Sequence, residues 1–344
     1  MSAENGTSAS VPAVKQYLRT AESCGVDYFP LLQKAGIDAA LLADNNARVS
    51  NHAMERLIGY LTTACNDPCL GLHSAQFVEP ATYSVLGYIS MNCANLREVL
   101  ANIPVFEKIV GDMGVSSTEP LGDCVLLSWH CQFLDDVARR QEVEAVIASW
   151  NAYTRNFLHV EPEYADAVWF EHSAPDDRDL IAEYRDFFAC EVLFEQRCSG
   201  IVIKNDVLEK PLPQRNEMLL QTLLDHATQL LADLDRDQPM TVQVKNMLRL
   251  MLTESAPSSA LIADKLGVSA RTLQRRLLDE DTYYKDVLNE LRLEMAMHYL
   301  QSTTLSLDRI ATKLGYAEPR SFYRSFKQWT GQTAGSFRAD VQED

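Results

Sequence analysis

Apolar residues recur at helical spacing along much of the first two hundred residues. Residues 51–64 show this most clearly, because Met54, Leu57, Ile58 and Leu61 share one side of a helix. The same spacing predicts helices over residues 15–35, 96–110, 135–158 and 179–188, with Asn95 as a candidate cap of the second. Apolar and aromatic runs without that spacing predict strands at residues 124–133, 167–172, 192–194 and 200–203.

These helices and strands follow one another without a regular strand–helix–strand rhythm. We therefore predict an α+β domain over residues 13–214, preceded by a small, polar stretch, residues 1–12, that we expect to be a disordered tail.

A distinct helix is predicted over residues 215–234, after the breaks at Pro211 and Pro213. It carries apolar residues at the 4-3-4-3 spacing of a heptad seam, namely Leu220, Leu224, Ala227, Leu231 and Leu234. Two interpretations stay open, since two heptads are few: the seam packs on its own domain, or it joins two chains in a homodimer. The polar residues 235–240, with Pro239, are predicted to be a linker.

Everything after the linker is predicted to be helical, and it contains an internal repeat. Residues 262–277 read IADKLGVSARTLQRRL, and residues 310–326 read IATKLGYAEPRSFYRSF, so the shared Ile-Ala-x-Lys-Leu-Gly recurs 48 positions later. The small alanines suit a close helix crossing, and Gly267 and Gly315 suit a sharp turn with positive φ. Candidate caps of the helices are Ser258, Ser306 and Ser269, and Pro319 suits a first turn. The repeat predicts two helix-turn-helix units within an all-α domain, residues 241–338, followed by an acidic tail, residues 339–344.

The second helix of each unit has an apolar face and a polar face. The pairs Leu273 with Leu277 and Phe322 with Phe326 are spaced to anchor it in the core. The polar residues that we predict to read base edges are Arg271, Thr272, Gln274, Arg275, Arg320, Ser321 and Arg324. Ser269 and Lys327 are predicted to contact phosphates. The interpretation as a plain helical bundle does not explain two arginine-bearing helices after two matching turns.

The net charge of −17 at first argues against a nucleic-acid partner. The charge is unevenly distributed, however, because residues 239–344 have a net charge of +1 and residues 1–238 a net charge of −18. The acidity therefore belongs to the first domain, and a DNA-binding role for the second is not excluded.

On these motifs the C-terminal region resembles the AraC/XylS family of bacterial transcription regulators, over about residues 242–338. The second helix-turn-helix unit carries the family's Gly-Tyr turn at Gly315, its Ser-x-Phe-x-Arg-x-Phe-Lys motif from Ser321, and a closing motif from Gly331. It departs at Ala334, where the family has proline, and at Phe337, where the family has tyrosine. Residues 286–301, with Arg292, Ala296 and Leu300, are similar to the family's long linking helix.

The first domain resembles the "arabinose-binding" type of sensor domain in this family. The similarity lies in Gly71-Leu72-His73, Leu86-Gly87-Tyr88, Leu96-Arg97-Glu98, the segment from Glu183 to Phe188, and Pro211-Leu212-Pro213. It implies an effector-responsive activator whose partners are double-stranded DNA, RNA polymerase, an unidentified small-molecule effector and a second copy of the chain. A first domain that only dimerises is a further possibility.

Enzyme signatures such as G-x-S-x-G, Walker A, H-E-x-x-H and G-x-G-x-x-G are absent from the sequence, so we do not expect an enzyme and assign no catalytic residue. His73, His130 and His172 could line a pocket, but we expect them to be hydrogen-bonded or on the surface. Trp129, Trp150 and Trp169 are expected in the core.

The eight cysteines are expected to be reduced, buried thiols in the cytoplasm, and no metal or cofactor is expected. The alternative function is a thiol- or metal-dependent sensor or repair protein that uses the same DNA-binding domain for targeting. We expect no membrane partner, because no apolar run is long enough to span a bilayer.

Overall fold

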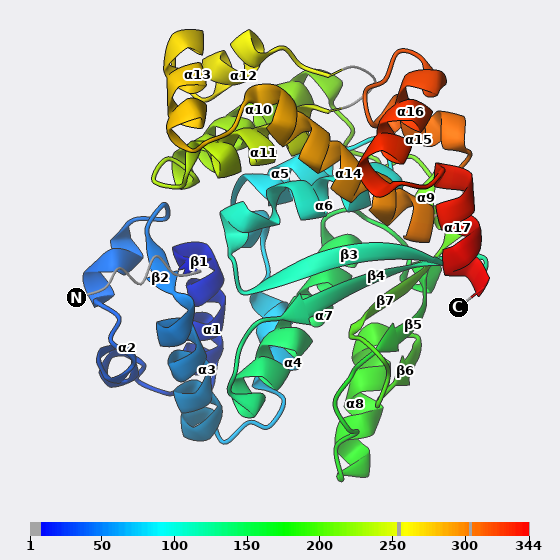
Figure 1. Cartoon of the computed structure of the whole chain (residues 1–344). Helices are drawn as coiled ribbons and strands as arrows, with labels where there is room; N and C mark the ends of the chain where they lie inside the picture. Colours follow the sequence, from blue (N-terminus) through cyan, green and yellow to red (C-terminus); the bar gives the residue numbers. More distant parts are fainter. Residues whose placement is uncertain (1–7, 253–255, 303–304, 344) are drawn as a thin grey trace. The chain divides into compact units, whose positions relative to one another are not determined.

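The computed structural model describes residues 8–252, 256–302 and 305–343 (Figure 1). It divides into two units, Met1–Ala227 and Thr228–Asp344. No helix in the described part of the chain is long and apolar enough to cross a membrane.

The first unit is built on a five-stranded sheet with the strand order β3-β4-β7-β5-β6 (Figure 1). Its strands are β3 (Gly114–Leu121), β4 (Cys124–Cys131), β5 (Ala165–Trp169), β6 (Glu191–Leu193) and β7 (Gly200–Lys204). All neighbours are antiparallel except β5 and β6, which are parallel. Together with its helices, this sheet confirms the predicted α+β class.

Alternation along the strands gives the sheet two apolar faces. In the register of β4 and β7, Leu127 pairs with Ile201 and Leu126 with Val202. Because successive side chains point to opposite faces, Leu127 and Ile201 face one way and Leu126 and Val202 the other. The first face lies under α5 (Ser84–Asn92), α6 (Leu96–Val110) and α7 (Asp136–Asn156). Side chains of these helices and of this face of the sheet line one cavity.

Several helices agree closely with the sequence prediction. Helix α6 spans the predicted residues, and the Asn95 side chain caps it by accepting a hydrogen bond from the Glu98 amide at 3.0 Å. Helices α3 (Asn51–Cys65) and α8 (Arg178–Phe188) each differ from the prediction by one residue. The helix predicted over residues 15–35 is instead two, α1 (Val11–Ser23) and α2 (Phe29–Ala35), because Gly25 has a φ of 72° and turns the chain.

Shorter elements complete the first unit, and several of them lack a clear sequence signal. They are α4 (Leu70–Ser74), α9 (Asn205–Leu208) and the 3-10 turns η1 (Ala39–Ala43), η2 (Ala75–Phe77), η3 (Pro80–Tyr83) and η4 (Pro162–Tyr164).

The predicted N-terminal tail is wrong for residues 8–12. Strand β1 (Ser8–Ser10) pairs with β2 (Arg48–Ser50), and α1 begins immediately afterwards. The Arg48 guanidinium fixes β1 by donating to Ser8 Oγ at 2.7 Å and to the Ser8 carbonyl at 2.8 Å. A polar segment is therefore ordered here by strand pairing and not by an apolar face of its own. Residues 1–7 lie outside the described residues.

Helix α10 (Glu217–Leu234) contains the predicted heptad seam, and the division into units falls within it. In the single chain Leu220, Ala227 and Leu231 are buried, whereas Leu224 and Leu234 are half-buried. Ala232 joins the core of the second unit. Gln243 donates to the Arg236 and Gln238 carbonyls, so the predicted linker is a turn held against the next helix.

The second unit is all-α, as predicted. Its helices are α11 (Met240–Met251), α12 (Ser259–Lys265), α13 (Ala270–Asp279), α14 (Tyr284–Ser302), α15 (Leu307–Lys313), α16 (Pro319–Thr330) and α17 (Ala334–Glu343). The predicted acidic tail is wrong for residues 339–343, which continue α17. Thr333 starts that helix by accepting a hydrogen bond from the Ser336 amide, so the proline usual at position 334 is not needed.

Candidate nucleic-acid interface

Each predicted helix-turn-helix unit has its own core, and α14 belongs to both. Val287 and Leu291 of α14 pack with α11, α12 and α13, whereas Ala296 and Leu300 pack with α15, α16 and α17. Met295 contacts both cores. Helix α14 therefore connects two similar units, as Figure 1 shows for α12–α13 at one end and α15–α16 at the other.

The two turns are built in the same way. The glycine after the first helix has a φ of 66° at Gly267 and 69° at Gly315, as the sequence predicted. Serine side chains cap the helices before each turn: Ser258 accepts from the Leu261 amide, and Ser306 from the Arg309 amide. Two short helices at a fixed angle follow from these local signals, and this geometry is the helix-turn-helix.

Helix α13 has a buried apolar face and a polar face. Leu273 and Leu277 have exposed fractions of 0% and 1% and anchor it in the core. Arg271, Gln274 and Arg275 are exposed, and Thr272 is half-buried. The Ser269 hydroxyl caps α13 by accepting a hydrogen bond from the Thr272 amide at 3.1 Å. The N-terminus of α13, with its free backbone amides, therefore lies next to the polar face of the helix.

Helix α16 repeats this arrangement with larger anchors. Phe322 and Phe326 are fully buried, and Pro319 is the first helical residue, as predicted. Arg320, Arg324 and Lys327 are exposed. Ser321 is half-buried, and its hydroxyl accepts a hydrogen bond of 3.5 Å from Arg324.

The arginines on these helices differ from the cations on α11. On α11, Lys245 pairs with Glu290 at 2.8 Å and Arg249 with Glu294 at 2.9 Å. Arg271, Arg275 and Arg320 have no ion-pair partner among the residues that the structure describes. Their charges are available to an outside anion. The sequence-predicted residues form two separate sets, one on each helix, in which all are exposed except the half-buried Thr272 and Ser321.

Arg292 has a positioning role that the sequence analysis did not assign. From α14 it donates to the Leu314 carbonyl at 2.8 Å and to the Gly315 carbonyl at 2.9 Å, and it lies 4.0 Å from the centre of the Tyr316 ring. Burial lowers the pKa of Arg292, and the ring face compensates part of that cost. One side chain thus fixes the second turn to the shared helix. In the sequence analysis, Arg292 is named as part of the linking helix but is not paired with the turn.

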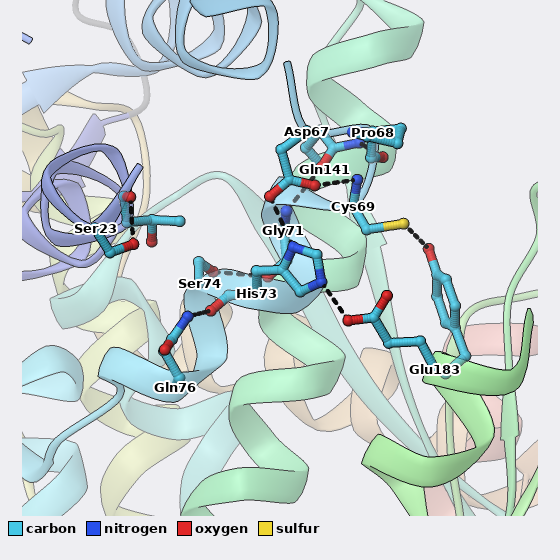
Figure 2. A network of polar contacts seen from close by, with 12 residues as sticks. Ser23, Asp67, Pro68, Cys69, Gly71, His73, Ser74, Gln76, Gln141 and Glu183 are labelled. Atoms are coloured by element: carbon cyan, nitrogen blue, oxygen red, sulfur yellow. Dashed lines mark hydrogen bonds and ion pairs between the residues drawn. The ribbon is translucent and has the colours of Figure 1, made fainter. Parts of the chain in front are cut away.

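His73 and His172 are hydrogen-bonded and His130 lies on the surface, as expected. His73 Nδ1 lies 2.7 Å from Asp67 Oδ2 and its Nε2 lies 2.8 Å from Glu183 Oε1, so it joins the loop before α4 to α8 (Figure 2). The hydrogen bond with Asp67 raises the pKa of His73 to about 9, against the opposing effect of burial. His172 lies 3.2 Å from buried Glu144, and burial lowers its pKa to about 4. His130 is exposed.

The tryptophans are only partly explained by core packing. Trp129 is buried and Trp150 is half-buried, but both line the cavity between the sheet and the helices above it. Trp169 is half-buried and packs on the opposite face of the sheet.

All eight cysteines are free, but the expectation that all are buried is wrong: only Cys69, Cys93 and Cys131 are buried, four are half-buried, and Cys24 is exposed. Burial raises the pKa of Cys69 to about 11 and of Cys131 to about 12. A raised pKa lowers the fraction of reactive thiolate. Among the described residues no group of three His, Cys, Asp or Glu side chains is placed to hold a metal ion.

Comparison with known proteins agrees with this architecture. Residues 25–212 match the family model of the arabinose-binding domain of AraC transcription regulators, and residues 262–340 match a helix-turn-helix domain model. Two Pseudomonas aeruginosa relatives are an ornithine utilization regulator, 25% identical over 91% of each chain, and the transcriptional regulator VqsM, 24% identical over 78% of this chain and 83% of that one.

A solved structure shows the same fold over nearly the whole length. The P. aeruginosa transcriptional regulator CdpR is 20% identical, with a TM-score of 0.50 over 95% of this chain and 98% of that chain. The match to the N-terminal model covers more than half of the sequence. The chain therefore belongs to the AraC family of DNA-binding transcription regulators.

Proposed function

We propose that this regulator reads DNA with α13 and α16 in successive segments of the major groove, in response to a small molecule bound by its first unit. The single observation that carries the proposal is the duplicated unit, in which each exposed arginine set stands on a helix anchored by a buried i,i+4 pair.

The shared helix supports the spacing. Helix α14 has 19 residues and is therefore about 28 Å long. One turn of B-DNA spans about 34–36 Å. Two helix-turn-helix units fixed near the ends of such a helix are separated by a distance of this order. They could therefore enter the major groove one turn apart on the same side of the duplex.

Side-chain chemistry suggests how the work is divided. Arg271, Gln274 and Arg275 would read bases in one segment, and Arg320 and Arg324 in the next, because guanidinium and amide groups match guanine and adenine edges. Thr272 and Ser321 lie beside them. Lys327, late on α16, and Ser269, at the amide end of α13, would contact phosphates.

Several finer features of this proposal follow from the family. We propose that the chain is an activator that contacts RNA polymerase, acts in the cytoplasm as a homodimer, and works by binding and not by catalysis. The effector is a small molecule, and its identity is not transferred from any relative.

Single substitutions test the base-reading roles. Arg271→Ala and Arg320→Ala should each cost about 1–3 kcal/mol on the preferred site and relax base preference at one or two positions. Lys327→Ala should weaken all sequences equally and reduce the slope of log K against log salt by about one. Arg19→Ala in the first unit, where Arg19 pairs with Glu79, is the charge-matched control and should change neither.

The measurement is equilibrium binding to a preferred and a scrambled duplex at several salt concentrations. If Arg320→Ala leaves both affinity and base preference intact, α16 does not read bases, and the proposal of two reading helices fails.

A further inference from the structure

The first unit contains an apolar cavity between its sheet and helices α5, α6 and α7. Its volume is about 110 Å³. An apolar cavity of about 150 Å³ accepts a benzene ring. This cavity is smaller, so a ring enters it only if its walls move outward. Its walls include Leu100, Leu127, Ile201 and the rings of Trp129 and Trp150.

One wall of the cavity is fixed by a glycine. A Cβ atom added at Gly114 would lie 2.4 Å from the Trp129 ring, which packs directly over that backbone. Gly114 and Trp129 therefore hold each other in place on neighbouring strands, and the ring is presented to the cavity as a rigid flat surface.

A single charged side chain lines the cavity, among the residues that the structure describes. This is Glu107 on α6, whose Oε2 accepts a hydrogen bond of 2.9 Å from the Ser116 amide. Burial raises the pKa of Glu107 to about 7. A carboxylate among apolar walls is costly unless a cation or donor accompanies it.

The Tyr83 hydroxyl is a second polar group in the lining. The Tyr83 hydroxyl is buried and has no hydrogen bond within the described part of the chain. The other two lining tyrosines are satisfied, since Tyr153 donates to the Gly87 carbonyl and Tyr164 to Asn151. Buried hydroxyls normally have a hydrogen-bond partner. A bound molecule can therefore supply the partner of the Tyr83 hydroxyl.

From these observations we propose that the cavity is the effector site and that it takes a small amine with an aromatic or branched aliphatic body, whose ammonium group pairs with Glu107. This inference rests on the proposed effector response. The body fills the space between Trp129 and Trp150. The ammonium group supplies a positive charge that balances the negative charge of the Glu107 carboxylate. In a site largely free of water such a pair is stronger than on the surface.

A matched set of three probes tests the charge preference in the full-length protein without DNA. Benzylamine, benzyl alcohol and benzoate have nearly the same shape but are cationic, neutral and anionic. Binding is followed by tryptophan fluorescence, because Trp129 and Trp150 line the site, and by calorimetry. We expect benzylamine to bind at least tenfold more tightly than benzyl alcohol, and benzoate more weakly than both. Affinity for the amine should rise from pH 6 to pH 8 as Glu107 ionises.

Two kinds of variant locate the site. Glu107→Gln keeps the side-chain shape and should remove the tenfold preference for the amine. Val146→Phe or Ile103→Phe places a ring in the cavity and should abolish binding of all three probes, with circular dichroism used to choose the variant that stays folded.

The proposal is overturned if folded wild-type protein binds none of the probes, if Glu107→Gln retains the preference for the amine, or if the filled cavity still binds it. DNA binding of the same preparations is measured separately. Protein that binds DNA but not benzylamine refutes only the effector site, and protein that binds benzylamine but not DNA refutes only the DNA-reading proposal.

Discussion

The His73 side chain, on α4, joins the loop before that helix to helix α8. Its contacts with Asp67 and Glu183 raise its pKa to about 9 from an unfolded value near 6.5. A group with a raised pKa in the folded state stabilises that state fully below its unfolded pKa. The stabilisation is lost as the pH rises through the folded pKa.

We therefore predict that His73→Gln lowers the free energy of unfolding by about 1–3 kcal/mol below pH 6.5. The difference from wild type should shrink as the pH rises toward 9. Denaturant unfolding at a series of pH values measures it, and His52→Gln, at a side chain that is 74% exposed, is the control. Parallel stability curves for wild type and His73→Gln would show that the charged pair contributes nothing.

At the scale of elements, the sequence predicts best where local signals are complete. Helix α6 has a cap at Asn95 and a glycine at its end, so its bounds follow from the sequence. Strand β3 was missed because its interior is mostly serine, threonine, glutamate and proline, and its ordering comes from pairing with β4. The break between α1 and α2 was missed because apolar spacing continues across Gly25.

The candidate sites divide in the same way. The exposed residues of α13 and α16 could be predicted, since each set lies between buried anchors four residues apart. The hydrogen bonds of Arg292 reach residues 22 and 23 positions away, and the cavity walls come from five or more elements. Contacts of this kind have no local pattern.

Helix α10 provides a test of the dimer prediction at this scale. Leu224→Glu changes a half-buried seam position and should raise the dimer dissociation constant at least tenfold, about 1.4 kcal/mol, if the seam joins two chains. Met218→Glu is the matched control, because Met218 is 84% exposed and lies outside the seam.

Sedimentation of both variants, with circular dichroism as a check on folding, measures the effect. A dimer that survives Leu224→Glu places the contact elsewhere. Loss of helical structure in that variant would show that the seam packs within its own chain, and either result contradicts the prediction.

At the scale of the whole molecule, an acidic first unit and a nearly neutral second unit perform separate tasks. The charge of the whole chain is unfavourable for DNA, but the exposed arginines of the second unit are concentrated on two helices. Short-range contacts to base edges can then specify a site, while the overall charge limits non-specific binding.

The most direct test of two reading helices is selection of bound sequences from random double-stranded DNA by the full-length protein. We predict two preferred blocks for each chain, with centres about 10–10.5 base pairs apart. Arg320→Ala should erase preference in one block and leave the other, which Arg271→Ala should erase in turn. A single block, or two blocks that respond together to either substitution, would contradict the account.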